Sequence, residues 1–265
     1  MLTKLLKHDL RGTGRIMVPV WVGSTALAVL ASIMSCFYRS YQWDDRHPLS
    51  ILTDLFGLTA VLCMVVLLVC VFVCAKRFYD LLGDAGYVYF TLPVKPWQHI
   101  AAKLVNAVIW TVGTILVMAV QMGLMSGPMN GAGTFSMDFD PGYPGWLALY
   151  CIEAVLLVLE SFAVGYLTLY LCMAIGAQWP QHRLLASVVT YFALSFAGQV
   201  LMIVTAGLTF RHLTKIVDSV EISVQQNPLP TMAAAWGGAL LILAAIGAIL
   251  WAVTQYFIGK KLNLG

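Results

Sequence analysis

The chain has 265 residues, of which 60% are hydrophobic and 10% are charged. A soluble domain carries about 25% charged residues, which it needs to cover its surface. The composition therefore excludes an ordinary water-soluble globule and indicates a membrane protein in contact with the lipid bilayer. Lys and Arg number 15 and Asp and Glu 12, for a net charge of +3, so we expect no nucleic-acid partner.

Six apolar stretches are long enough to cross a membrane. A spanning helix needs about 20 mostly apolar residues, because the hydrocarbon core is about 30 Å thick and a helix rises about 1.5 Å per residue. The stretches are Ile16–Phe37, Leu55–Ala75, Leu104–Met125, Trp146–Ala177, Leu184–Phe210 and Met232–Ile258. The sequence thus predicts an all-α, polytopic membrane protein in which residues 16–265 form a single transmembrane domain of six helices.

The connections between these stretches differ in basic residues, which cytoplasmic connections retain. With the N-terminus inside, the inner side holds Lys4, Lys7, Arg11, Arg15, Lys76, Arg77, Lys95, Lys103, Arg183, Lys260 and Lys261. The outer side then holds only Arg39, Arg46, Arg211 and Lys215. We therefore predict a multi-pass protein with both termini in the cytoplasm.

Three features lie outside the apolar cores or at their edges. Residues 1–15 place four leucines on one helical face among basic residues, which predicts an interfacial helix and then a bend at Gly12 and Gly14. Residues 211–225 repeat apolar side chains at helical spacing, which predicts a short amphipathic outer helix, either a gate or an interfacial element. Asp54 is expected to begin the second helix, where a carboxylate favours the N-terminus.

No pattern of catalytic or metal-binding residues emerges. The six cysteines lie in or beside apolar stretches, and none has the C-x-x-C spacing of metal ligands, so we expect small buried hydrophobic residues and no metal site. No intramembrane serine-protease motif and no His-Glu-x-x-His motif occurs. We therefore expect no catalytic residues in the chain.

The connection over residues 76–103 is unusually apolar for a segment between two spans. It reads KRFYDLLGDAGYVYFTLPVKPWQHIAAK. Apolar and aromatic surface of this extent usually covers a partner protein. The alternative is that these side chains pack against the ends of the chain's own helices.

The stretch Arg77–Val94, followed by Ala102-Lys103-Leu104, resembles the cytoplasmic loop of small type-2 ABC exporter permeases of Gram-positive bacteria. The closing run Lys260–Leu264 is similar to the way such chains end. One position departs from the pattern, since Ala85 stands where relatives commonly have Glu. A contact made by that Glu would be replaced or absent here.

The resemblance implies a half-transporter in the bacterial plasma membrane. A coupling helix within residues 76–103 would dock into a separately encoded cytosolic ATPase, and the chain would pair with a second permease copy, identical or similar. The docking residues that the resemblance implies are Phe78, Tyr79, Leu82, Gly83, Asp84, Gly86 and Tyr87. No G-x-x-x-x-G-K-[ST] loop occurs, so we expect no enzymatic activity and no cofactor in this chain, with ATP and Mg bound by the partner.

Two glutamates lie inside the fourth predicted span. Glu153 and Glu160 are seven residues apart and share a helix face, at depths of ~10 and ~21 Å. A carboxylate near the helix centre costs about 2.5–3.5 kcal/mol, so both should point away from lipid. Our hypothesis is that they line a substrate pathway for cationic or amphipathic cargo. The available partners are hydrogen-bonding groups such as Asn106, Gln121 and Gln199, a protonated carboxyl, or a bound cation. The alternative is a structural hydrogen bond at a subunit interface.

The sequence therefore predicts the transmembrane permease subunit of an ATP-driven ABC exporter. Two alternatives stay open. A non-transporting immunity or sensor subunit bound to an ATPase needs only the docking loop, and a stand-alone secondary transporter needs only the pathway.

Overall fold

The computed structural model describes the backbone over residues 2–40, 48–83, 96–129, 144–179, 181–226 and 228–261. Side chains are described over residues 3–37, 54–83, 97–125, 148–179, 181–204 and 230–259. All regular structure in these ranges is helical.

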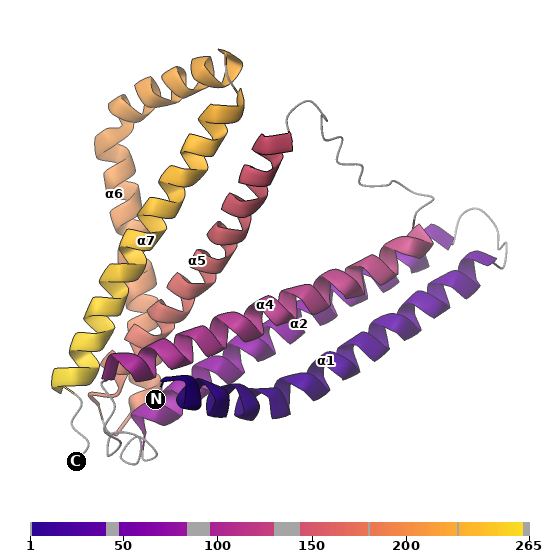
Figure 1. The fold of residues 1–265 in the computed structure, drawn as a ribbon, viewed down its shortest axis with the longest axis horizontal. Coiled ribbons are helices and arrows are strands. Elements are labelled where there is room, and N and C mark those ends of the chain that lie inside the picture. The colour runs from indigo at the N-terminus through magenta and orange to yellow at the C-terminus, as the bar shows by residue number, and fades with distance from the viewer. Residues whose placement is uncertain are drawn as a thin grey trace. The chain divides into compact units, whose positions relative to one another are not determined.

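Six helices make up the fold in the described ranges (Figure 1). They are α1 (Leu2–Ser40), α2 (Pro48–Leu82), α4 (Pro96–Met129), α5 (Pro144–Gly176), α6 (Arg183–Gln226) and α7 (Pro228–Lys261). Each contains a segment long and apolar enough to cross a membrane. This confirms the prediction of an all-α, multi-span membrane protein with six candidate spans.

Four of the helices begin at a proline, namely Pro48, Pro96, Pro144 and Pro228. Proline suits this position because its fixed φ is helical and its missing N–H has no partner in the first turn of any helix. The predicted helix start at Asp54 is wrong, since α2 begins more than a turn earlier at Pro48.

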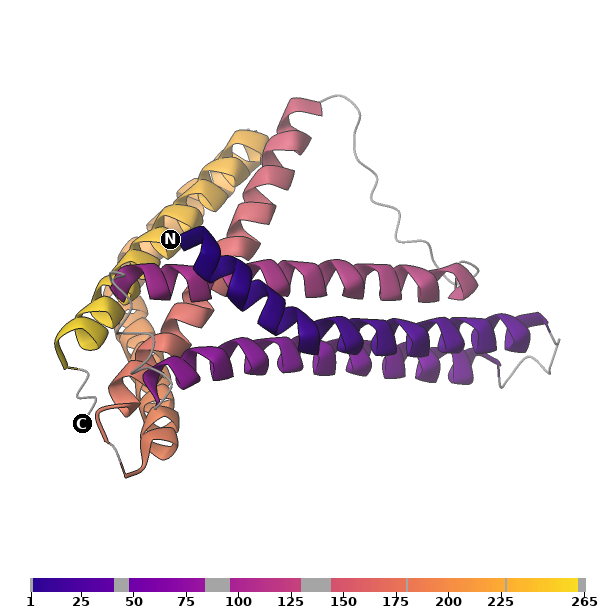
Figure 2. The ribbon, with the colours of Figure 1, turned by 60° about the horizontal axis from the view of Figure 1, so that its bottom comes forward.

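Two helices that the sequence predicts as separate elements are parts of longer ones. α1 runs without interruption through Gly12 and Gly14, although it changes direction along its length (Figure 2). α6 includes residues 211–225 and bends in its C-terminal half (Figure 1). Glycine inside a helix costs only about 1 kcal/mol, so it permits a bend without ending the helix.

The end of α2 also differs from the prediction. α2 continues past Ala75, where the predicted span ends, and stops at Leu82. Gly83 then donates its N–H to the carbonyl oxygen of Asp80 at 3.3 Å, which closes the last turn. The described part of the predicted coupling helix is therefore the end of α2, and residues 84–95 lie outside the described ranges.

The chain divides into two compact units. The first consists of Met1–Arg77 and Ala101–Phe139, and thus of α1, nearly all of α2 and most of α4. The second consists of Phe78–Ile100 and Asp140–Gly265, and includes α5, α6 and α7.

The second unit is built around α5, which packs against both α6 and α7. A tight corner joins α5 to α6, and the N–H of Ala177 donates to the carbonyl oxygen of Met173 at 2.9 Å within it. Gly176 is required at this corner, because a Cβ there would lie 2.6 Å from the backbone nitrogen of Ser187. The corner therefore sets where α6 begins.

Candidate functional site

A buried ion pair joins α1 and α4 in the first unit. Lys103 Nζ lies 2.8 Å from Asp9 Oδ1, and the two side chains are 6% and 2% exposed. One turn along α1, Thr13 Oγ1 donates to the carbonyl oxygen of Asp9 at 3.0 Å and accepts a hydrogen bond from Asn106 Nδ2 at 3.1 Å. Asp9, Thr13, Lys103 and Asn106 form what we call the buried polar cluster.

Arg77 of α2 approaches the backbone of α1 at Gly12, the residue before Thr13 of the buried polar cluster. A Cβ at Gly12 would lie 2.7 Å from Arg77 Nη1, so the glycine permits the close approach of the guanidinium. Arg77 Nε, Asp9 Oδ2 and Asn106 Oδ1 are buried and have no hydrogen-bond partner among the described residues. The end of the first unit that we predict to be cytoplasmic therefore holds charged and polar groups away from water.

Further polar contacts hold α4 against α1 and α2. Gln121 Nε2 donates to Ser24 Oγ at 2.8 Å, and Cys63 Sγ donates to Gln121 Oε1 at 3.3 Å. Such interhelical hydrogen bonds stabilise helix packing in lipid, where little hydrophobic driving force acts between helices. Asn106 and Gln121 are thus hydrogen-bonded within the first unit. Gln199, the third expected partner, is exposed.

The last turn of α2 packs on α5 through an aromatic stack. The rings of Phe78 and Tyr170 lie 3.8 Å apart between centroids, with 12° between their planes. Both side chains are fully buried, and Tyr166 lies one turn away on α5 with its ring centroid 6.2 Å from that of Tyr170. The Phe78 and Tyr170 rings are nearly parallel and in close contact, so the burial of their apolar area stabilises this contact.

The residues predicted to dock an ATPase therefore have different surroundings. Phe78 and Leu82 are buried within this chain, and their docking role stays a prediction. The alternative, in which aromatic and apolar residues pack against the helix ends, describes these two. Tyr79 and Gly83 are half-buried. The remaining three, Asp84, Gly86 and Tyr87, lie outside the described residues.

The two glutamates of α5 lie on the face that packs against α7. Tyr150, one turn before Glu153, meets Trp236 of α7 edge-on with 5.8 Å between ring centroids. Val164, one turn after Glu160, lies 3.5 Å from where a Cβ of Gly247 in α7 would stand. Residues three, four and seven apart share a helix face, so Glu153 and Glu160 lie between these two contacts.

This stretch of α7 offers the glutamates no hydrogen-bond donor. Residues 237–250 read GGALLILAAIGAIL, which contains only apolar side chains and glycine. Glu153 and Glu160 are half-buried, and one carboxyl oxygen of each, Oε2, is buried without a hydrogen-bond partner in the part of the chain that is described. A buried polar group without a partner is costly, so each of these oxygens is available to accept a hydrogen bond from a bound donor.

Two features of the site were not predicted from the sequence. The ion pair of Asp9 and Lys103 could have been suspected, because Asp9 is the single acidic residue among the basic residues of positions 1–15. Tyr170, which stacks on Phe78, could not be identified from the sequence, because an aromatic residue in an apolar span has no distinctive pattern.

Comparison of the chain with protein-family models, with curated proteins and with solved structures gave no match. The length and apolar composition of the helices define the class of the protein as a multi-span, α-helical membrane protein with six candidate spans.

Proposed function

We propose that the chain is the transmembrane permease subunit of an ATP-driven exporter of the type-2 ABC class. It would lie in a bacterial plasma membrane with both termini in the cytoplasm, bind a cytosolic ATPase through the segment after Lys76, and pair with a second permease copy. Six candidate spans, the excess of basic residues in alternate connections and the resemblance of the loop over residues 77–94 support this proposal.

The observation that carries the proposal is the stack of Phe78 on Tyr170. Phe78 belongs to the segment that resembles an ATPase-docking loop, and Tyr170 belongs to α5, the helix with Glu153 and Glu160. A helix is stiff along its axis, so a displacement of the segment after Lys76 would move α5 as well. This contact supplies a mechanical route from a docked ATPase to the glutamates.

The face shared by α5 and α7 is the proposed substrate pathway. It combines an apolar wall with two carboxyl groups whose Oε2 atoms have no partner among the described residues. A cationic or amphipathic cargo would supply both the hydrogen-bond donor and the apolar surface that such a wall accepts. ATP hydrolysis would act by shifting the balance between two states of the helices, as any effector does.

Co-purification with the ATPase encoded beside this chain tests the docking step. Asp80 is exposed on the last turn of α2, so Asp80→Trp adds bulk to the proposed docking surface without disturbing the stack. We expect Asp80→Trp and Gly86→Arg to recover at least about tenfold less ATPase than the wild type. A loss of about 1.4 kcal/mol of binding free energy is enough for a tenfold change. The matched control is Asp54→Trp, the same change at an exposed position near the other end of α2.

The outcome separates the alternatives. Failure of the wild type to bring down any ATPase would leave a stand-alone membrane protein. Recovery of an ATPase whose turnover responds to no cargo would favour the immunity or sensor subunit.

Glu160→Gln tests the pathway separately from docking. It removes a charge while keeping the shape of the side chain, so we expect stimulation of the complex by cationic amphipathic peptides to fall at least about tenfold. ATPase recovery and basal turnover should stay unchanged. Ser161→Ala is the control, because the exposed Ser161 hydroxyl donates only to the Val158 carbonyl of its own helix in the contacts described. Equal stimulation of wild type and Glu160→Gln would leave the structural hydrogen bond as the role of Glu160.

A further inference from the structure

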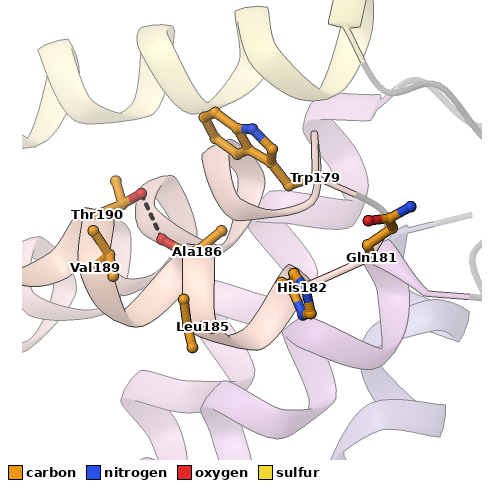
Figure 3. Close-up of a pocket in the computed structure, with 7 residues that line it drawn as sticks. All are labelled: Trp179, Gln181, His182, Leu185, Ala186, Val189 and Thr190. Carbon is orange, nitrogen blue, oxygen red and sulfur yellow. Dashed lines mark hydrogen bonds between the residues drawn. The ribbon is translucent and has the colours of Figure 1, made fainter.

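A groove of about 500 Å³ lies at the corner between α5 and α6 (Figure 3). Trp179, Gln181 and His182, from the connection between the two helices, line one end of it. The other end is lined by the first turns of α6. All lining residues belong to the second unit. A volume of this size falls within the range of about 300–1,000 Å³ that is typical of small-molecule sites.

The groove is polar at one end and apolar at the other. His182, Leu185 and Val189 recur at helical spacing along one face of α6, so the groove runs from the helix start into the span. Thr190 also lines the inner end, but its hydroxyl donates to the carbonyl oxygen of Ala186 at 2.7 Å and is therefore already bonded (Figure 3). The inner end thus offers an apolar surface, and the outer end offers side-chain donors.

The polar end favours a negative charge. The α6 helix begins there, with the N–H of Ala186 donating to the His182 carbonyl at 2.9 Å, and a helix N-terminus attracts anions through its free N–H groups and dipole. Arg183, the first residue of α6, does not line the groove but brings a positive charge next to His182, which does. Residues 177–190 contain no Asp or Glu. This end of the groove therefore combines side-chain donors of Trp179, Gln181 and His182 with a neighbouring positive charge, and this segment contributes no carboxylate.

We propose that this groove binds a phospholipid with an anionic headgroup. The connection over residues 177–183 is on the predicted cytoplasmic side, so the lipid would come from the inner leaflet. Its phosphate would lie at the start of α6 near His182 and Arg183, and one acyl chain would follow Leu185 and Val189. Basic residues at the cytoplasmic ends of spanning helices attract anionic lipids in this way.

This inference is independent of the proposed transport function. It rests on the α5–α6 corner alone, whereas the transport proposal rests on the end of α2 and on the α5–α7 face. A lipid assay on the full-length chain without any ATPase therefore tests the groove and leaves the transporter proposal untouched.

The test is native mass spectrometry of the purified, delipidated full chain in detergent. The probes are phosphatidylglycerol, phosphatidylcholine with the same acyl chains, and glycerol phosphate. We expect phosphatidylglycerol to bind about tenfold more tightly than phosphatidylcholine, and glycerol phosphate to show no competition, because it lacks the acyl chain. Arg183→Gln should reduce the preference for phosphatidylglycerol about fivefold, the effect of one basic side chain near an anionic headgroup.

Filling the groove should abolish the preference. Val189 lines the groove and is 56% exposed, so Val189→Trp places an indole in it without crowding the protein interior. The matched control is Val188→Trp, at a neighbouring position that is 46% exposed and does not line the groove. We expect at least tenfold weaker binding of phosphatidylglycerol to Val189→Trp and wild-type binding to Val188→Trp. Leu185→Trp, also at an exposed lining position, is a second groove-filling variant.

Three results would overturn the proposal. Equal affinity for phosphatidylglycerol and phosphatidylcholine would show that the groove does not recognise an anionic headgroup. Equal binding by Val189→Trp, Leu185→Trp and Val188→Trp would place the lipid elsewhere on the chain. Competition by glycerol phosphate at the same concentration as the lipid would show a site for free phosphate esters instead.

Discussion

Lys103→Met should lower the free energy of unfolding by about 3–5 kcal/mol, because it leaves Asp9 with a buried charge and no ionic partner. Asp9 is 2% exposed, and its second oxygen already lacks a hydrogen-bond partner among the described residues. Removing Lys103 therefore takes away the compensation for a carboxylate that water cannot reach. Chemical unfolding of the purified protein in detergent micelles measures the loss.

The double variant Asp9→Leu, Lys103→Met distinguishes this mechanism from a general loss of packing. Replacing both members of a buried ion pair by apolar residues of similar size is often neutral or stabilising, so the double variant should recover most of the stability. Lys7→Met, at an exposed position of the same helix as Asp9, should change stability by less than about 0.5 kcal/mol. A double variant as unstable as Lys103→Met would mean that the methylene groups of Lys103, rather than its charge, hold α4.

The polar contacts of the first unit give the buried ion pair a structural role, which is to set the register of α1 against α4. Asp9, Thr13 and Ser24 of α1 meet Lys103, Asn106 and Gln121 of α4 in the same order along both helices, so the two helices run parallel. Each contact fixes the same register between the helices. A buried polar residue that specifies register is the best-attested use of such groups.

Hydropathy was enough to predict the six spans, because the thickness of the bilayer fixes the length of each apolar stretch. It did not predict where the helices end. α1 and α6 continue through segments whose polar residues suggested separate elements, since helical hydrogen bonding does not stop at the membrane surface. In each helix a bend, and not a break, separates the span from its extension. The amphipathic spacing of the residues is the same for a bent helix and for two separate helices, so it did not distinguish them.

The burial of Phe78 continues the spacing of the buried side chains along α2, which the structure shows and the almost uniformly apolar sequence of the span does not. The buried side chains of this helix continue at intervals of three and four past the predicted end of the span: Cys63, Val66, Cys70, Cys74, Phe78 and Leu81. The aromatic composition of the segment predicted a partner surface, with packing against the chain's own helix ends as the alternative. Which surface buries Phe78 depends on α5, and a single sequence does not reveal contacts between residues 92 positions apart.

The position of the glutamates bears on two predictions that both stay open. Hydrophobic cost predicted that Glu153 and Glu160 avoid lipid, and both are half-buried on the face of α5 that packs against α7. The lack of donors on that part of α7 follows from the sequence of residues 237–250 only once α7 is known to be the neighbour. The substrate role of these carboxyl groups stays a prediction.

Phe78→Ala should cost about 3–5 kcal/mol of stability, because it removes a fully buried ring and its stack on Tyr170. The same change should also lower cargo-stimulated ATPase turnover in the complex more than it lowers recovery of the ATPase, since the docking surface outside the stack is retained. Unfolding in detergent and turnover at a temperature where the variant stays folded measure the two effects separately.

Two variants define the contribution of the ring. Phe72→Ala, on the same helix but 69% exposed, should change stability by less than about 0.5 kcal/mol. Phe78→Leu keeps most of the buried volume and loses the aromatic contact, so it should cost about 1 kcal/mol and still reduce stimulated turnover. Full stimulation in Phe78→Leu would show that volume alone links the end of α2 to α5. Full stimulation in folded Phe78→Ala would remove this contact from the coupling route and, with it, the observation on which the transport proposal rests.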